Sequence, residues 1–499
     1  MRLKVFKILF ILSLNPLFSQ EKLSGFIISE STNLPLENVT IFNSDTNEIS
    51  YTDIEGKFSI LIKSIDSEIN IYKEGYSLLT KFYSPQTSEL KDVTLKLIPK
   101  IEVLNEVVVR GNLKKIFQIK RMEDVEGTRI YAGKKNEVIL IDVSMANLAS
   151  NNARQIYNQI PGLNIYQNDD AGLQLNIGGR GLNPNRTANF NTRQNNYDIS
   201  ADALGYPESY YTPPPEGLEE IQILRGAASL QYGTQFGGLI NFKIKKPKPE
   251  DKFELITRNT AGSNNLFTNF TSISSSNEKS SYYGYVNYKN GDGFRPNSEF
   301  KSINTFQNFN YNLNEKSKIT GEITYMEYLA HQAGGLSDFM FANDPFQSNR
   351  ERNWFEIKWF LYNLKYLLEI SEDSSFSFNF FGLDAQRNSL GFRTNRVDQI
   401  DYGEERDLIK GKFKNFGFES RYLTNYNLLE KKSYLLLGAK YYNSYSQSIQ
   451  GPGSGSSNAD FNFDYTNFPN YVNQSEYIYP NSNLAIFGEN IFYINKNLS

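Results

Sequence analysis

Few residues in this chain of 499 amino acids could carry out catalysis. It has one histidine, His331, and no cysteine, so it has no thiol nucleophile and too few cysteine and histidine ligands for a zinc site. A solitary histidine is more often incidental than a metal ligand. The stretch GGRG at 178–181 lacks the lysine and the spacing of a phosphate-binding loop. We therefore expect neither an enzyme nor a resident metal or cofactor.

A short apolar stretch, LNEVVVRGN at 104–112, suggests binding instead. Val107, Val108 and Val109 favour a strand. An unpaired strand presents N–H and C=O groups that invite pairing with another chain. Two interpretations are open: the stretch completes the domain that precedes it, or it is a strand to which a partner adds.

The composition is unusual for a soluble enzyme. Aromatic residues make up 14% of the chain but hydrophobic residues only 39%, which suits a polar-lined sheet protein. The net charge of −3 gives no support for nucleic-acid binding. Residues 1–20 have basic residues before the apolar run 8–14, which is typical of a cleaved secretory signal. No later run reaches about 18 apolar residues, so a membrane-spanning form of this chain would be a closed barrel.

Turn signals and short apolar runs divide the mature chain before residue 248. Residues 21–100 are expected to form a small β-sandwich, and 101–129 contain the valine stretch and a charged linker. Residues 130–247 are expected to be mixed α/β. In that segment we expect a short helix before Pro161, a strand running into the glycine turn at 178–181, and strands at 220–224 and 239–245.

Residues 248–499 alternate apolar and polar side chains with the period of a strand. Phe376, Phe378 and Phe380 alternate with serine and asparagine, and the stretch KITGEITY at 318–325 alternates in the same way. A membrane barrel turns such an apolar face to lipid, whereas a sandwich hides it against another sheet. The period alone leaves both arrangements open.

The connections between the expected strands favour the barrel. With strands of about ten residues, short charged joints near 276, 313, 371, 429 and 495 alternate with longer joints at 291–299, 331–353, 389–409 and 445–483, and the joint at 262–265 is short. This yields about ten strands. Ten strands could enclose little more than their own side chains, so we expect an incomplete barrel of the roughly 22-stranded, plugged type. The expected fold is mainly β, with a transmembrane antiparallel barrel, an α/β plug and an N-terminal sandwich.

Two family resemblances account for most of the chain. The stretches LSGFIISESTNLPLENVTI, YTDIEGKFSI and YKEGY resemble the carboxypeptidase-regulatory-like β-sandwich family, which is a non-catalytic partner of zinc peptidases. The ordered motifs between 161 and 246 resemble the plug of TonB-dependent outer-membrane receptors. The matching residues are Arg180, Gly181, Arg225, Gly226, Tyr232, Gly233, Gly237, Gly238 and Asn241, although Tyr-Gly and Gly-Gly are separated by three residues here where four is usual.

The second resemblance implies a role for the valine stretch. In these receptors a short segment before the plug, the TonB box, is captured as an added strand by the periplasmic protein TonB, and Asn105, Glu106, Val107, Val108 and Val109 stand at that place. TonB, driven by its inner-membrane energising complex, would disturb the plug and open a path. The implied location is the outer membrane, in contact with its lipid, with the N-terminal domain in the periplasm.

Within that family, the stretches at 177–186 and 333–347 look like those of ferric-citrate receptors, which implies an iron chelate as cargo. Arginine recognises carboxylates bidentately. The candidate ligand-binding residues are Arg186, Arg193, Gln194, Asn195, Arg350, Arg352, Arg387, Arg393 and Arg396, each of which is by itself more often a solvated surface residue. Another siderophore, an oligosaccharide or a peptide is the alternative cargo. A non-transporting surface β protein is the alternative from another class.

Overall fold

The computed structural model describes residues 21–62, 67–84, 90–99, 119–141, 147–150, 152–157, 160–173, 175–201, 209–225, 231–233, 237–248, 252–428, 431–494 and 499. The chain divides into two compact units, residues 1–112 and 113–499, and each is described by itself. The expected signal at 1–20, the expected TonB box at 105–109 and Gly226 lie outside the described residues.

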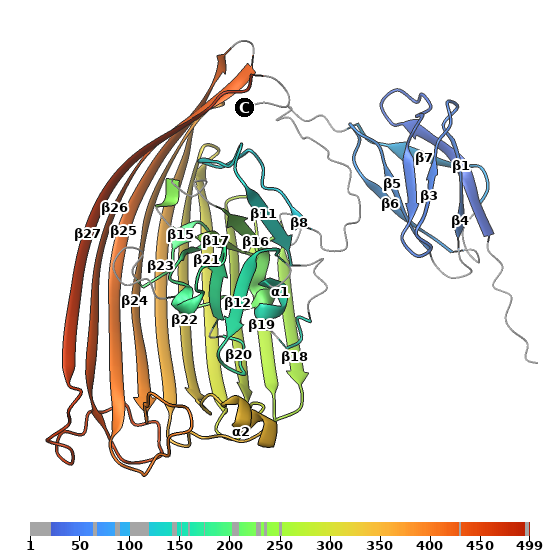
Figure 1. The fold of residues 1–499 in the computed structure, drawn as a ribbon. Coiled ribbons are helices and arrows are strands. Elements are labelled where there is room, and N and C mark those ends of the chain that lie inside the picture. The colour runs from blue at the N-terminus through green and yellow to red at the C-terminus, as the bar shows by residue number, and fades with distance from the viewer. Residues whose placement is uncertain are drawn as a thin grey trace, which may run out of the picture. The chain divides into compact units, whose positions relative to one another are not determined.

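The first unit is a β-sandwich, as expected (Figure 1). One sheet has the order β4 (Lys57–Ile62), β1 (Glu21–Ser29), β7 (Val93–Leu97), and the other has the order β3 (Glu48–Tyr51), β2 (Thr40–Asn43), β5 (Ser67–Tyr72), β6 (Leu79–Tyr83). Alternate residues of both sheets, among them Leu23, Ile41 and Leu97, form one buried core. Because every member of this core lies between residues 23 and 97, the domain has an apolar core of its own.

The plug segment of the second unit is built on a six-stranded sheet (Figure 1). Its order is β15 (Tyr197–Asp198), β14 (Phe190–Gln194), β17 (Gly238–Ile244), β16 (Leu218–Leu224), β11 (Asn136–Leu140), β8 (Ile119–Lys120). Two hairpins accompany it: β9 (Val125–Glu126) with β10 (Arg129–Ile130), and β12 (Leu163–Gln167) with β13 (Leu175–Gly179). Helix α1 (Arg154–Tyr157) and the 3-10 turns η1 (Asn185–Thr187) and η2 (Pro215–Gly217) complete the described plug.

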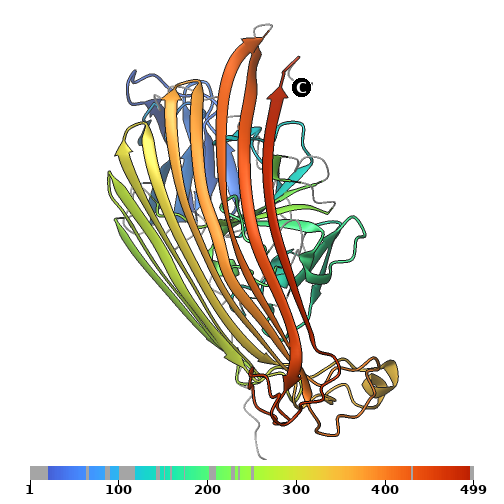
Figure 2. The same ribbon diagram turned by 90° about the vertical axis from the view of Figure 1, so that its left-hand side faces the viewer.

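Ten antiparallel strands then follow one another in sequence and in space, as expected (Figure 2). They are β18 (Phe253–Ala261), β19 (Phe267–Ser276), β20 (Ser280–Gly291), β21 (Phe300–Asn314), β22 (Ser317–His331), β23 (Trp354–Ser371), β24 (Ser374–Gly391), β25 (Arg406–Leu428), β26 (Lys431–Gly453) and β27 (Ser475–Ile491). The first and last strands do not pair with each other in the described structure, so the sheet is open. We call this curved sheet the barrel wall.

The alternation in the sequence separates the two faces of the wall. Ser377 and Asn379 are buried on the concave face, whereas Phe378 is 38% exposed on the outer face. On β22, Glu322 and Thr324 are buried and Ile323 is 49% exposed. At these positions the outer face is therefore apolar and has no partner within the described structure, while polar side chains point to the concave face.

From β20 onward the strands are longer than the expected ten residues or so, and two of the expected connections were therefore too long. β25 and β26 each have 23 residues. The connections observed are 392–405 and 454–474 rather than 389–409 and 445–483. Residues at these strand ends, such as Ser444 and Gln447, are polar, but their backbones continue the ladder. Pairing of backbone groups does not require an apolar face, and a prediction from apolar alternation therefore underestimates the length of the strands.

The plug packs directly on the concave face of the wall. Ile221, Ile240 and Phe242 of the plug share one buried apolar cluster with Phe306 and Trp359 of the wall. Part of the concave face that the plug covers is thus apolar. The connection 332–353 carries a short helix, α2 (Asp338–Asn343). Among the helices that the structure describes, none is long and apolar enough to cross a membrane.

Candidate functional site

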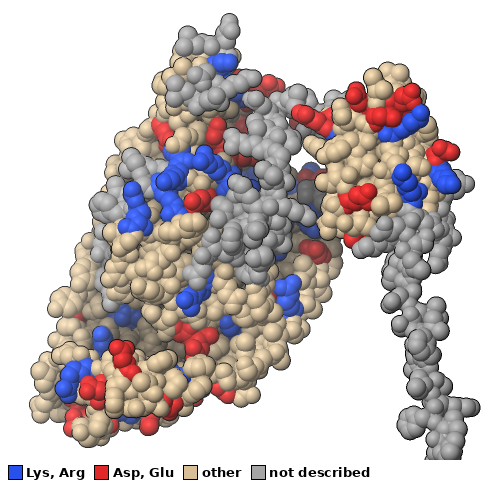
Figure 3. Space-filling model, turned by 45° about the vertical axis from the view of Figure 1, so that its right-hand side comes forward, with Lys and Arg blue, Asp and Glu red and all other residues tan. Residues whose placement is uncertain are grey.

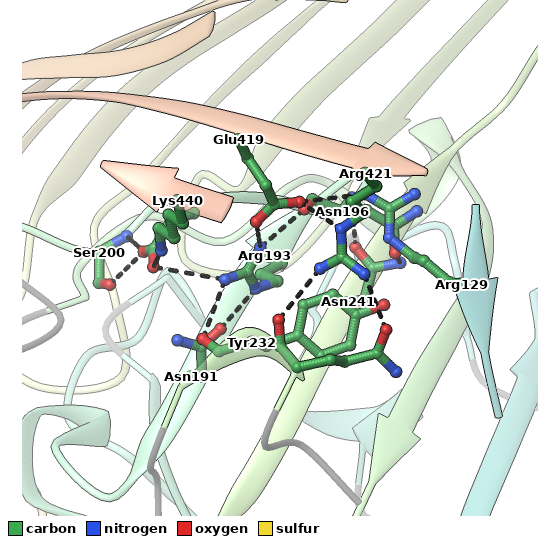
Figure 4. Close-up of polar contacts among 12 residues, drawn as sticks. Arg129, Asn191, Arg193, Asn196, Ser200, Tyr232, Asn241, Glu419, Arg421 and Lys440 are labelled. Carbon is green, nitrogen blue, oxygen red and sulfur yellow. Dashed lines mark hydrogen bonds and ion pairs between the residues drawn. The ribbon is translucent and has the colours of Figure 1, made fainter. Parts of the chain in front are cut away.

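Six charged side chains meet where the plug contacts the barrel wall (Figure 4). Arg129, Arg193 and Asp198 belong to β10, β14 and β15 of the plug. Glu419 and Arg421 lie on β25, and Lys440 on β26. Glu419 and Arg421 are two residues apart on one strand, so both side chains point to the concave face. We call these six residues the plug–wall charge cluster.

Glu419 is the centre of this cluster. Its Oε1 lies 2.7 Å from Arg421 Nε and 3.8 Å from Arg129 Nη2, and its Oε2 lies 3.9 Å from Arg193 Nη1. The guanidinium groups of Arg193 and Arg421 also lie 4.6 Å and 4.9 Å from the ring centre of Tyr232. One carboxylate of the wall therefore faces cations from both sides of the interface.

The cluster is buried and carries more positive than negative side chains. Arg193 and Arg421 are 0% and 1% exposed, and Glu419 is 2% exposed. Asp198 is the second carboxylate, with Arg193 at 3.9 Å and Lys440 at 3.7 Å. Within the described structure, neither Glu419 Oε2 nor Asp198 Oδ2 accepts a hydrogen bond. Since unpaired buried charges are costly, each carboxylate is important for holding the plug in place.

Further hydrogen bonds join the plug to the wall around the cluster. Asn195 Nδ2 donates to Glu322 Oε1 at 2.7 Å, and Gln194 Nε2 donates to Thr324 Oγ1 at 3.0 Å. Arg421 also donates to the Gln231 side chain at 2.7 Å. The first two of these contacts are made at a turn with left-handed residues, with φ of 45° at Asn195 and 74° at Asn196. Asparagine tolerates this conformation better than most residues.

The plug motif residues predicted from the sequence make contacts within the plug or lie in its turns. The ring of Tyr232 lies against Arg193 and Arg421 of the cluster. Asn241 Oδ1 accepts a hydrogen bond from the backbone N–H of Asn196 at 2.8 Å. Arg225 pairs with Glu137 at 2.7 Å. Gly238 has φ of 122°, and a Cβ there would lie 2.4 Å from the carbonyl oxygen of Leu224, so only glycine fits. Arg180, Gly181, Gly233 and Gly237 lie in or beside turns of the same plug.

Five of the expected ligand residues are buried in this conformation, namely Arg193, Gln194, Arg350, Arg352 and Arg387, and Asn195 is half-buried. Arg193 and Gln194 are 0% exposed within the plug–wall contact, and Asn195 bonds to the wall beside them. Arg387 is buried on β24, with its guanidinium 5.8 Å from the ring of Tyr210. For Arg186 the structure describes only the backbone, in η1. Arg193, Gln194 and Asn195 therefore contribute to the contact between the plug and the wall in this conformation.

Arg350 and Arg352 join the outer connections to one another. Arg350 donates to the carbonyl oxygens of Asn349, Val397 and Gln399 and to Thr394. Arg352 pairs with Asp401 and donates to the carbonyl oxygens of Glu404 and Gly455. Arg406, at the start of β25, donates to the carbonyl oxygens of Arg352, Ser454 and Asn458. We call Arg350, Arg352 and Arg406 the loop arginine clasp.

The clasp changes the acidity of its carboxylate partner. Burial raises the pKa of Asp401, but the hydrogen bonds and charge of Arg352 more than offset this, so the pKa lies below its usual value. Arg393 and Arg396 differ from the clasp residues because both are exposed on the connection 392–405. Arg396 is 75% exposed, and its contact with Asp398 is long, at 3.9 Å. Among the expected ligand arginines whose side chains the structure describes, these two are the exposed ones.

The residues that the sequence reasoning missed are Arg129, Asp198, Glu419, Arg421 and Lys440. A signal was present in the strand that begins at Arg406. Its outward residues Phe416 and Phe418 set the register, which places Glu419 and Arg421 on the concave face. A charge at an inward position of a wall strand indicates a partner inside the wall. His331, in contrast, stacks on Trp354, and no group of three or more possible metal ligands occurs in the described residues.

The geometry defines a class of protein: a plug domain seated by charges and apolar packing against the concave face of a large antiparallel sheet. Two family models match the chain. Residues 142–239 match the TonB-dependent Receptor Plug Domain, and residues 23–109 match the CarboxypepD_reg-like domain. The chain thus contains a TonB-dependent receptor plug and a carboxypeptidase-regulatory-like domain, and the two expected resemblances are confirmed. No curated protein sequence matches it.

Several solved structures share the fold at low identity. The ferric citrate transporter FecA in its unliganded form is 18% identical, with a TM-score of 0.61 over 73% of this chain and 55% of that chain. The ferric-catecholate import receptor Fiu from E. coli K12 is 10% identical, with a TM-score of 0.54 over 75% and 60%. BauA, the ferric preacinetobactin receptor from Acinetobacter baumannii, is 12% identical, with a TM-score of 0.53 over 72% and 55%. The chain thus spans little more than half the length of these receptors.

Proposed function

We propose that this chain is part of a TonB-dependent outer-membrane receptor that imports a ferric chelate, with ferric citrate or a related carboxylate siderophore as the first candidate. The observation that carries the proposal is the plug domain seated on the concave face of a ten-stranded wall whose outer face exposes many apolar side chains. Lipid would cover the outer face. The N-terminal domain would lie in the periplasm.

The proposed mechanism follows from the location of the receptor in the outer membrane. The outer membrane has no ATP and no ion gradient of its own, so energy has to arrive mechanically. TonB, driven by its inner-membrane complex, would add a strand to Asn105–Val109 and pull on the plug. The plug–wall charge cluster would then separate, and its cost of separation would keep the path closed without TonB. Iron would pass as chelated cargo, so the protein needs no metal of its own.

Deletion of Asn105–Val109 tests the TonB step in the complete receptor. We expect energy-dependent uptake of radioactive iron as ferric citrate to be lost, while binding of the chelate to whole cells is retained. A matched deletion of five linker residues, 113–117, should preserve uptake. Uptake that continues after removal of 105–109 would reject the TonB-box assignment.

Arg393 and Arg396 are our candidates for recognition of the anionic cargo, because both are exposed on an outer connection. Alanine at both positions should weaken binding of ferric citrate, and more at low than at high salt, because exposed charges are screened. Lys91→Ala, on the exposed surface of the N-terminal domain, is the control and should leave affinity unchanged. An effect of the arginine variants that does not depend on salt would indicate packing instead of charge.

The second candidate cargo is an oligosaccharide or a peptide. The carboxypeptidase-regulatory-like domain at 23–109 favours it, since this domain type also occurs in glycan importers. Growth of strains with and without the gene on a panel of iron chelates and of glycans separates the two. A growth defect on glycans alone would replace the chelate with an uncharged cargo. No defect on any of them, with intact surface display, would favour a non-transporting surface protein.

A further inference from the structure

The N-terminal domain has a groove between two strand edges that lack a partner. β6 is the last strand of one sheet and β7 the last strand of the other, and neither pairs on its outer side within the described structure. The groove has a volume of about 480 Å³. Its lining includes Leu79, Lys81 and Tyr83 from β6 and Thr94, Leu95 and Lys96 from β7. Such edges are templates for an added strand.

The chemistry of the groove favours an apolar segment that also carries acidic residues. Tyr83 and Leu95 are buried at its floor, and Phe82 at its rim is 70% exposed. Lys81 and Lys96 line it, and none of its described lining residues is acidic. Elsewhere the domain is different, because acidic residues outnumber lysines in 21–99, and both kinds appear on the face in Figure 3. The groove is thus the basic part of an acidic domain.

The chain itself brings a suitable segment to this place. Ser77 N–H donates to the carbonyl oxygen of Ile98 at 2.9 Å, and Tyr76 forms a bridge with Pro99. These contacts hold the end of the described domain beside the start of β6. Only residues 100–103 separate Pro99 from the valine stretch, and four extended residues reach about 13 Å. A segment tethered so closely has a high effective concentration at the groove.

The sequence of that segment complements the groove. In an extended conformation, Val103, Val107 and Val109 would share one face, and Glu102 and Glu106 the other. The valines suit the apolar floor, and the two glutamates suit Lys81 and Lys96. The family model for the N-terminal domain also extends to residue 109, beyond the last described strand. We propose that residues 102–109 dock in the groove between β6 and β7 as an additional strand of the N-terminal domain.

This docking goes beyond the proposed function, because it gives the same segment a second partner within its own chain. Backbone groups of one strand edge cannot pair twice at the same time. Capture by TonB would therefore compete with the groove for residues 105–109, and the domain would regulate access to the segment. The docking itself requires no transport, so it can be tested separately from the import proposal.

Disulfide trapping in the full chain tests the docking directly. Because the chain has no cysteine, an engineered pair gives the one disulfide that can form. Thr94→Cys on β7 is combined in turn with cysteine at each position from 105 to 109. Adjacent strands bring opposite residues within the Cα distance that a disulfide needs. We expect at least one pair to form about ten times faster than its control.

The control places the first cysteine at Tyr51 on β3, which is the free edge at the other side of the same domain and is 62% exposed. If the Tyr51→Cys pairs form as fast as the Thr94→Cys pairs, contact is non-specific and the proposal is overturned. Charge supplies a second readout. Lys81→Glu with Lys96→Glu should lower the trapping rate severalfold, whereas Lys22→Glu with Lys73→Glu, an equal change of net charge, should not.

Hydrogen exchange of the full chain without any substitution completes the test. Amides of 105–109 should be protected, and addition of the purified periplasmic domain of TonB should abolish trapping at Thr94→Cys. Absence of both trapping and protection overturns the docking, even if deletion of 105–109 abolishes uptake. Trapping that survives saturating TonB would retain the docking strand but remove the competition. Failure of uptake to depend on 105–109 affects the import proposal and leaves the docking result standing.

Discussion

Two groups of buried arginines in the second unit are held in different ways. In the plug–wall charge cluster, Arg129, Arg193 and Arg421 face a single carboxylate, Glu419. In the loop arginine clasp, Arg350 and Arg406 donate mainly to backbone carbonyl oxygens and hydroxyl groups, and Arg352 combines one carboxylate with two carbonyls. The cluster therefore concentrates its ion pairs on two carboxylates, chiefly Glu419, whereas the clasp distributes its contacts over three connections.

This difference is consistent with two mechanical roles. A contact that depends on a few buried charges is strong while intact and fails as a unit, which suits the plug movement that we propose. A contact with many neutral acceptors loses little when one acceptor is removed, which suits outer connections that need a fixed shape. The predictions below test whether the two groups respond to substitution in these two ways.

Glu419→Gln should give the largest effect. The substitution keeps the size of the side chain but leaves three buried arginines without their shared counter-charge. We expect it to weaken plug seating by about 3–5 kcal/mol, the usual cost of removing one partner of a buried pair. Trp359 reports on seating because its indole donates to the Ile199 carbonyl of the plug at 3.3 Å. Urea unfolding followed by its fluorescence, in a Trp354→Phe background, measures the loss.

Asp384→Asn is the matched control on the neighbouring strand. Asp384 pairs with Lys414 at 3.1 Å, but the two side chains are 57% and 68% exposed. Exposed pairs contribute roughly 0–1 kcal/mol, so the urea midpoint should hardly change. Equal shifts for Glu419→Gln and Asp384→Asn would mean that burial does not determine the importance of the cluster.

Arg352→Lys should give an intermediate effect in the clasp. Lysine keeps the charge but cannot reproduce the planar set of bonds to Asp401, Glu404 and Gly455. We expect a local loss of about 1–3 kcal/mol, visible as faster proteolysis within 392–405 and 454–474. Seating of the plug should be unchanged. Arg396→Lys, at an exposed position of the connection 392–405 that Arg352 contacts, should match the wild type. A change in plug seating for Arg352→Lys would show that the clasp and the cluster do not respond separately.

The sequence predicted the wall better than it predicted the cluster. Phe378 and Ile323 show the alternation that defines the outer face, and ten strands follow from it. Strand ends were underestimated because residues such as Gln447 continue the ladder without an apolar face. Arg193 and Gln194 were expected to meet a ligand, but their burial depends on side chains of the wall more than 120 residues away. Pairing between distant strands has no local signal in one sequence.

A third charged group, within the plug, is expected to give the smallest effect. Lys243 lies 2.7 Å from Glu126 and 2.9 Å from Glu220. Burial raises the pKa of Glu126, but the charge and hydrogen bond of Lys243 more than offset this, so its pKa lies below the usual value. Burial lowers the pKa of Lys243, but its two carboxylate partners outweigh burial and raise it. Both shifts indicate ion pairs that stabilise the folded plug at neutral pH.

The sign of the pH dependence follows from these directions. The contribution of Glu126 is present above the pKa of an unfolded glutamate, roughly 4.3, and is lost as the pH falls through its lower folded value. The contribution of Lys243 is fully present in this acid range, because it is lost only as the pH rises through the raised pKa of the lysine. Since Glu126 is one-third exposed, we expect an effect of at most about 1 kcal/mol.

Lys243→Met tests this assignment by removing the cation from both pairs. The urea midpoint of the wild type should fall as the pH is lowered below roughly 5, and that of the variant should fall less, because its glutamates gain protons without losing a partner. Lys135→Met, at an exposed position of the plug, should keep the wild-type slope. If Lys243→Met also keeps the wild-type dependence of the urea midpoint on pH, acid sensitivity arises elsewhere in the plug. The plug–wall charge cluster would then be the next group to test, by the same measurement on Glu419→Gln.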